Sequence, residues 1–172
     1  MKKKFLIPVI LIALAVVAGV LLYMNRDYIK DSREGLSEGQ VKVVSQGEEL
    51  GIIDLNCLKV DLAMVTVEDQ INASGSDAVS HVFGGVYLQD ALDLVGIDYQ
   101  AYTDITFRSL DGYASASNME EMEADKLFLV YEIDGAATKS MEDGGSGPLE
   151  VVILGETFSQ RNCKYLSEIE LN

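Results

Sequence analysis

The chain has 172 residues, which is enough for one domain of ordinary size. It carries 13 Lys and Arg residues against 28 Asp and Glu residues, a formal net charge of −15. This acidity argues against a nucleic-acid-binding protein, because phosphate contacts need clustered Lys and Arg. Two cysteines and one histidine are too few for a disulfide scaffold, a four-thiolate zinc site or a multi-histidine metal site.

The first segment is apolar and long enough to cross a membrane. Residues 5–24 form a run of 20 residues without a charged side chain. A helix of this length spans about 30 Å, the thickness of the hydrocarbon core of a bilayer. The run exceeds the apolar region of a cleaved signal peptide, about 7–15 residues, and ends in a poor cleavage site, Leu-Leu-Tyr-Met-Asn. We expect residues 1–24 to be an uncleaved signal anchor, with cleavage as the alternative.

The charges beside this run bear on its orientation. Three lysines at residues 2–4 precede it and three cations follow it between residues 26 and 33, so the count of cations is nearly equal. The compact lysine cluster is typical of a signal anchor. We therefore expect a single pass through the cell membrane with the C-terminal domain extracytoplasmic. Residues 25–40 are polar and predict a juxtamembrane linker, and residues 41–172 predict the folded domain.

The pattern after residue 40 predicts a strand-rich α+β fold. In chain order we expect a strand at 41–44, a turn at 47–51, a short helix at 53–58 opened by Asp54, a strand at 62–67, a loop at 72–80, a helix at 87–95 ended by Gly96, a strand at 104–109, a turn at 111–112, a strand at 126–133, a loop at 141–148, and strands at 149–154 and 163–171. The strongest strand is 126–133, which we expect to be central. The clearest helix is 87–95, because its apolar residues follow the i, i+3, i+4, i+7 spacing.

Five short motifs follow one another in the predicted domain. They are Phe83-Gly84-Gly85-Val86-Tyr87-Leu88, Ser109-Leu110-Asp111-Gly112-Tyr113-Ala114, Leu129-Val130-Tyr131-Glu132-Ile133-Asp134-Gly135, Gly147-Pro148-Leu149-Glu150-Val151-Val152 and Lys164-Tyr165-Leu166-Ser167-Glu168-Ile169-Glu170. In this order and spacing they resemble segments of the sulfite oxidase-type molybdopterin-binding domain, a family of oxidoreductases. The resemblance covers roughly residues 41–172. It implies the fold of that domain, which we expect to follow the single N-terminal transmembrane helix indicated by the apolar run.

Departures from the family pattern put the catalytic chemistry in doubt. The resemblance implies a molybdenum-binding Cys in the loop that matches residues 67–81, but this segment holds Glu68 and Asp69 and no Cys. A carboxylate does not readily replace a soft thiolate as a ligand. The Arg of the family's Pro-Leu-Arg is Glu150 here. Residues 41–172 also carry seven basic and 24 acidic side chains, which disfavours a phosphate-bearing pterin and an anionic substrate.

These departures favour a non-catalytic binding or accessory module on the outer face of the membrane, without a cofactor. The resemblance implies a pocket between residues 67–81, 111–113 and 144–148. The candidate ligand-binding residues are Glu68, Asp69, His81, Asp111, Tyr113 and Glu150. One alternative is an active molybdopterin-dependent oxidoreductase with Cys57 or an unusual ligand at the metal. Another is a structural partner subunit of a membrane complex. The expected partners are the membrane and either a small molecule or a membrane protein.

Several residues keep two interpretations. Cys57 and Cys163 predict either one disulfide or two buried free thiols. His81 is either an acid–base group or a structural histidine, and the second is favoured. The acidic residues between 120 and 125, and those at 142–143, are interpreted as solvated charge, because their spacing matches no calcium-binding loop.

Overall fold

A computed structural model of the chain describes residues 12–20, 36–71, 78–156 and 158–172. The chain divides into two units, Met1–Glu34 and Gly35–Asn172. Residues 12–20 of the first unit are helical, and the rest of the apolar run 5–24 lies outside the described residues, as does most of the predicted linker. In the ranges described, no helix combines the length and apolar character needed to cross a membrane. The membrane span therefore stays a prediction.

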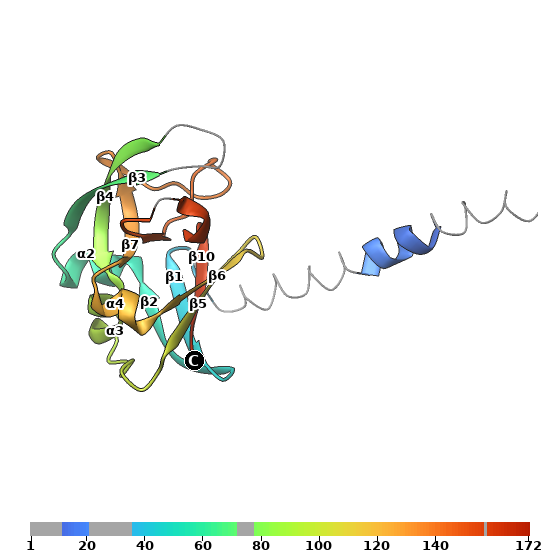
Figure 1. Cartoon of the computed structure of the whole chain (residues 1–172), viewed down its shortest axis with the longest axis horizontal. Helices are drawn as coiled ribbons and strands as arrows, with labels where there is room; N and C mark the ends of the chain where they lie inside the picture. Colours follow the sequence, from blue (N-terminus) through green and yellow to red (C-terminus); the bar gives the residue numbers. More distant parts are fainter. Residues whose placement is uncertain (1–11, 21–35, 72–77, 157) are drawn as a thin grey trace, which may run out of the picture. The chain divides into compact units, whose positions relative to one another are not determined.

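The second unit contains two five-stranded sheets (Figure 1). The first has the order β2-β1-β10-β5-β6. Its strands are β1 (Gln40–Ser45), β2 (Glu48–Asp54), β5 (Asp104–Ser109), β6 (Ala114–Asn118) and β10 (Leu166–Leu171). β1 and β10 run parallel, and the other neighbours are antiparallel. The parallel pair places the first and last described strands of the domain side by side in the middle of the sheet, although their residues are more than 120 positions apart.

The second sheet has the order β3-β4-β7-β8, and β9 also pairs with β7. These strands are β3 (Val65–Ile71), β4 (Val79–Tyr87), β7 (Leu127–Ile133), β8 (Ala136–Ala137) and β9 (Glu150–Ile153). All pairs in it are antiparallel. Strand β7 lies between β4 on one side and β8 and β9 on the other. The prediction of a central strand at 126–133 is therefore confirmed.

Three short α-helices and one 3-10 turn complete the described part of the domain. They are α2 (Leu55–Asp61), α3 (Leu88–Leu94), α4 (Met119–Glu123) and η2 (Ser159–Arg161). The side chain of Asp54 accepts a hydrogen bond from the Asn56 N–H at the start of α2, which confirms the predicted helix opening. The predicted helix at 87–95 is α3. Gly96 follows it with φ of +72°, as expected at a helix C-terminus.

The main core lies between the two sheets. It joins apolar side chains of β1, β5 and β10 to those of β7, β9, α2 and α3. Leu127 and Leu129 of β7 point into this core, while Phe128 and Val130 belong to a second, smaller cluster on the other face of the sheet. Because residues 127–131 of β7 are buried on both faces, their sequence is a continuous apolar run instead of an alternating one.

Three predicted elements need correction. The expected turn at 47–51 is mostly strand β2, and the turn itself consists of Gln46 and Gly47. Pairing with β1 holds this segment in a strand, while its charged side chains face solvent. The expected strand at 62–67 begins at Val65, since α2 continues to Asp61. The segment 67–81 is largely strand, with β3 and β4 paired from Val65↔Gly85 to Ile71↔Val79. Residues 72–77 of the expected loop lie outside the described residues.

Gly85, the second glycine of the first motif, lies on β4 in close contact with the backbone of β7. The register of this pair shifts between Gly84 and Gly85. A Cβ atom on Gly85 would be 2.0 Å from the carbonyl oxygen of Leu129. Only a residue without a side chain fits against backbone at that distance. The motif is thus explained by the approach of two strands.

Candidate functional site

A cavity of about 300 Å³ lies where the end of β3, the turn after β5, the start of β9 and the segment leading to β10 meet. It is lined by Ile71, Asp111, Tyr113, Glu150, Ser159, Asn162, Lys164 and Tyr165. The structure therefore brings three of the six predicted site residues, Asp111, Tyr113 and Glu150, to one cavity. We call this cavity the Glu150 pocket.

The turn at residues 111–113 forms one wall of the Glu150 pocket. Gly112 has φ of +89° and donates its N–H to the carbonyl of Ser109 at 3.1 Å. The side chain of Asp111 accepts a hydrogen bond from the Tyr113 N–H at 2.9 Å. This is the predicted Asp-Gly turn. The Tyr113 hydroxyl donates to the carbonyl of Gln160, so the turn is tied to η2 across the cavity.

The opposite wall comes from the segment that enters β10. Tyr165 has φ of +53° and donates its N–H to the carbonyl of Ser146 at 2.6 Å. Its own carbonyl accepts from Leu110 N–H at 3.0 Å. A Cβ on Gly147 would be 2.7 Å from the Cα of Tyr165, so the glycine permits this close packing. The motif residues at 109–113, 147–150 and 164–165 are thereby held against one another.

Glu150 is the most buried charged residue of the pocket, with 1% of its surface exposed. Ser146 hydrogen-bonds its carboxylate, whereas Oε2 is buried without a hydrogen-bond partner among the described residues. Burial raises the pKa of the Glu150 carboxyl, and Ser146, Lys164 and His81 only partly offset this effect. An unpartnered buried oxygen of this kind is costly unless something else satisfies it.

The other three predicted residues lie on the paired strands β3 and β4 and have partners there. Glu68 accepts a hydrogen bond from the Ser80 hydroxyl at 2.9 Å. Asp69 accepts from the Gly155 N–H at 2.7 Å. His81 Nδ1 lies 2.7 Å from an Asp134 carboxylate oxygen. None of the three lines the Glu150 pocket.

The pair of His81 and Asp134 joins β4 to the turn after β7. The second carboxylate oxygen of Asp134 accepts the Val82 N–H at 2.9 Å. The backbone hydrogen bond and the His81 side chain both lower the pKa of Asp134. These contacts tie β4 to β7 and agree with the structural interpretation of His81.

The two cysteines lie in different environments and are both free, so the predicted disulfide is wrong. Cys57 is exposed on α2, which contradicts the alternative of two buried thiols as well. Cys163 is fully buried and bridges to Val151 through two backbone hydrogen bonds of 2.9 Å. Burial, with the nearby charges of Asp111 and Glu150, raises the pKa of the Cys163 thiol to about 12. Cys57 lies on the exposed side of α2 and Cys163 in the core opposite Val151, so the two side chains are not joined.

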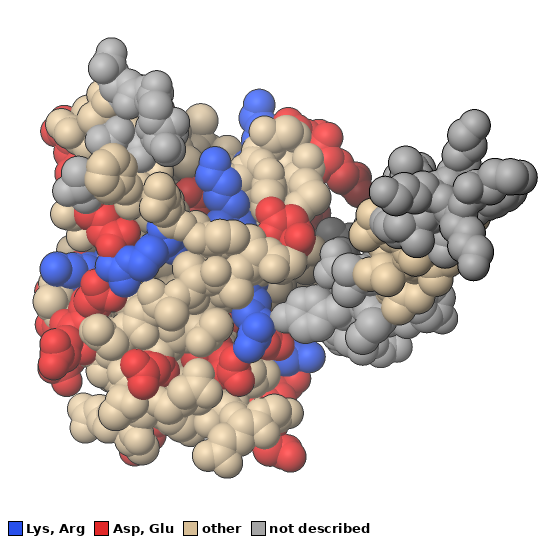
Figure 2. Space-filling model, turned by 45° about the vertical axis from the view of Figure 1, so that its right-hand side comes forward, with Lys and Arg blue, Asp and Glu red and all other residues tan. Residues whose placement is uncertain are grey.

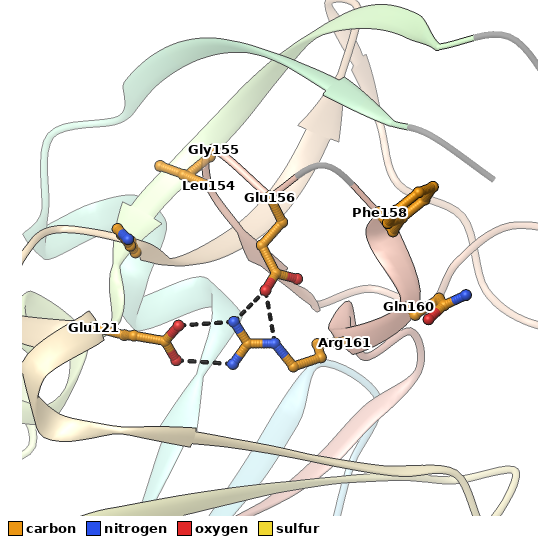
Figure 3. Close-up of a pocket in the computed structure, with 8 residues that line it drawn as sticks. Glu121, Leu154, Gly155, Glu156, Phe158, Gln160 and Arg161 are labelled. Atoms are coloured by element: carbon orange, nitrogen blue, oxygen red, sulfur yellow. Dashed lines mark hydrogen bonds and ion pairs between the residues drawn. The ribbon is translucent and has the colours of Figure 1, made fainter. Parts of the chain in front are cut away.

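A second cavity, of about 540 Å³, contains an ion-pair network that sequence reasoning missed (Figure 3). Arg161 forms two hydrogen bonds to the carboxylate of Glu121, at 2.9 and 2.7 Å, and also binds Glu156. Glu121 is thus not solvated charge, as predicted for the acidic residues at 120–125. The Arg161 guanidinium and the Ser117 hydroxyl lower the pKa of Glu121 to about 2. Because both cavity carboxylates already hold the arginine, its charge is neutralised within the network.

Sequence reasoning also missed five of the residues that line the Glu150 pocket: Ile71, Ser159, Asn162, Lys164 and Tyr165. Of these, Lys164 and Tyr165 occurred in a recognised motif. The motif at 164–170 was the available signal, since it begins with the one cation among the described residues that line the pocket. Ser159 and Asn162 stand in an irregular segment that carries no periodic pattern.

Charge over the domain surface is mixed. On the face shown in Figure 2, Lys and Arg side chains are interspersed among Asp and Glu side chains. Within the described residues, no group of three or more His, Cys, Asp or Glu side chains is arranged to hold a metal ion. The pocket itself combines the carboxyl groups of Asp111 and Glu150 with the ammonium of Lys164.

Comparison with known proteins agrees with the motif order and with the strand-rich fold. No match was found among curated proteins. The family model for the oxidoreductase molybdopterin binding domain matches residues 47–172, which is most of the chain. Among the described strands, this match covers all but β1, and it includes all eight residues that line the Glu150 pocket. The chain therefore belongs to the oxidoreductase molybdopterin-binding domain family.

Proposed function

We propose that this domain is a non-catalytic member of its family that binds a ligand in the Glu150 pocket. The observation that carries the proposal is the donor set of that pocket. Motif residues that the resemblance associates with cofactor and substrate contacts line it, yet its charged side chains are Asp111, Glu150 and Lys164, without a thiol. A pocket with retained walls and altered chemistry favours binding over molybdenum-dependent oxidation.

The residues present do not fit a molybdopterin group. The thiolate is the form of Cys that binds a metal. Cys163 is fully buried with a strongly raised pKa, and Cys57 is exposed on α2 and does not line the pocket. The phosphate of the pterin would also meet two carboxyl groups in the pocket. We derive no catalytic step through this group.

Elemental and pterin analysis tests the proposal. We expect full-length protein purified from its native host to be folded and to contain molybdenum far below one atom per chain. Native expression is the control for cofactor supply. Stoichiometric molybdenum and pterin would contradict the proposal and make the protein an oxidoreductase. The Cys57→Ser variant would then show whether that thiol holds the metal.

We further propose that the N-terminal segment anchors the domain on the outer face of the cell membrane. Its support is the apolar run 5–24 behind a lysine cluster. The anchor would place the Glu150 pocket in contact with extracellular solutes. The acidity of residues 41–172 also suits a domain held beside an anionic membrane surface without binding to it.

Thiol labelling in intact cells tests this topology, because Cys57 is exposed and Cys163 is buried. A membrane-impermeant maleimide should label native protein at Cys57 alone, and denaturation should make Cys163 reactive as well. The Cys57→Ser variant should not be labelled in intact cells, and Cys163→Ser should be labelled like the original protein. Labelling of Cys57 only after lysis would contradict an extracytoplasmic domain.

A further inference from the structure

The most unusual group in the Glu150 pocket is the carboxylate oxygen Oε2 of Glu150. The residue is 1% exposed, and this oxygen has no hydrogen-bond partner within the described part of the chain. Buried polar side-chain atoms in native proteins nearly always have a partner. Because Glu150 also lines a cavity, a ligand bound there would be in a position to supply the missing hydrogen bond.

We propose that the Glu150 pocket binds a small organic amine, whose ammonium group donates a hydrogen bond to Oε2 of Glu150. This inference rests on the proposed function and specifies its ligand. In its ionised form the Glu150 carboxyl only accepts hydrogen bonds, so the partner of Oε2 in that form is a donor. A cationic donor makes the stronger, charge-assisted bond.

The rest of the pocket fits such a ligand. Its second carboxyl group, Asp111, adds negative charge. Tyr113, Tyr165 and Ile71 supply aromatic and aliphatic surface, which suits an organic cation with an apolar body. The volume of about 300 Å³ is at the lower end of the range for ligand pockets, so the ligand is small.

Two features of Glu150 support a cationic partner. Burial disfavours the ionised form of the Glu150 carboxyl and raises its pKa, and a bound ammonium would stabilise that ionised form. Among the described residues that line the cavity, Lys164 is the only cation, and it is exposed, so its own charge is shared with water. The Lys164 ammonium does not form a hydrogen bond with Oε2 of Glu150.

The test compares two probes of the same shape and opposite charge, benzylammonium and benzoate, by amide chemical-shift titration of the full-length protein in detergent. Benzylammonium should shift the amides of Asp111, Tyr113 and Tyr165, and benzoate should not. In Glu150→Gln, which keeps the shape of the side chain, the affinity for benzylammonium should fall by about tenfold or more.

A second variant gives a change of opposite sign. Lys164→Met removes the like charge from the pocket and should strengthen benzylammonium binding roughly twofold to threefold. Lys126→Met is the matched control, because Lys126 lines the other cavity, and it should leave binding unchanged. An unfolding curve for each variant shows that it is folded.

Three results would overturn the inference: absence of benzylammonium shifts at the pocket, benzoate binding as tight as that of the amine, or unchanged amine binding in folded Glu150→Gln. The molybdenum and pterin analysis is a separate readout. Metal-free protein that ignores benzylammonium would reject the amine and leave the non-catalytic assignment standing, whereas stoichiometric molybdenum would reject that assignment itself.

Discussion

Replacing Gly85 with alanine should destabilise the domain by about 3 kcal/mol or more, which is the upper end of the cost of overpacking a well-packed site. The added Cβ would lie 2.0 Å from the carbonyl oxygen and 2.9 Å from the carbonyl carbon of Leu129. These are backbone atoms of the central strand β7, so no side-chain rotation relieves the contact. Strands β4 and β7 would have to move apart. Both strands contribute side chains to the two core clusters, so the packing of both clusters would be disturbed.

Urea unfolding of the two proteins measures this effect. Gly51→Ala is the matched control, because Gly51 is also a strand glycine and its nearest neighbour would be the flexible Ile97 Cδ1 at 3.4 Å. The control should change the free energy of unfolding by about 0.5 kcal/mol or less. Equal stability of Gly85→Ala and Gly51→Ala would show that β4 and β7 do not approach as closely as described.

Replacing Arg161 with methionine should cost about 2 kcal/mol at neutral pH, less than the loss of one partner from a fully buried ion pair. The Arg161 side chain is 37% exposed, and those of Glu121 and Glu156 are 20% and 21% exposed. Solvent therefore screens part of the interaction. The variant leaves two partly buried carboxylates close together without a shared cation, as the arrangement in Figure 3 makes clear.

The loss should depend on pH in one direction. The pKa of Glu121 is about 2 in the folded protein, against 4.5 for an ordinary Glu. Its contribution to stability is present above 4.5 and disappears as the pH falls toward 2. The difference in unfolding free energy between the original protein and Arg161→Met should therefore be largest at neutral pH and shrink across this window.

The control for this experiment is Lys126→Met, which removes a positive charge from the same cavity. Lys126 has only a minor effect on the pKa of Glu121. Its effect should be about 0.5 kcal/mol or less at every pH. Arg161→Met combined with Glu121→Gln should recover part of the loss, because one unpaired charge is gone. A pH-independent effect of Arg161→Met would assign the loss to packing of the arginine stem instead of the ion pairs.

Much of the fold follows from local patterns. Helix α3 repeats its apolar residues at helical spacing, Asp54 is a good N-cap, and the first five residues of β7 form an apolar run. Segments without such a pattern were missed. Strand β6 reads Ala-Ser-Ala-Ser-Asn and lacks large apolar residues, and α4 has five residues of which three are glutamates. Their structure depends on pairing with β5 and on the Asn118 cap.

The candidate site divides in the same way. Motif order identified Asp111, Tyr113 and Glu150, and the structure gathers them at one pocket. The same reasoning placed Glu68, Asp69 and His81 with them in a loop, whereas these residues lie mainly on paired strands with partners of their own. Charge and residue type did not distinguish the two groups, because hydrogen-bond partners far away in sequence decide which polar side chain remains available.

The sequence by itself determined the acidic character, the apolar run 5–24, the strand-rich class, the family and the absence of a Cys between residues 67 and 81. These properties depend on composition, local periodicity and motif order. Only the tertiary structure decided that Arg161 holds Glu121, 40 residues away, that the cysteines stay apart, and that Glu150 is buried with an unpartnered oxygen in a cavity. The reason is physical: these features arise from long-range strand pairing and burial, which local sequence patterns do not specify.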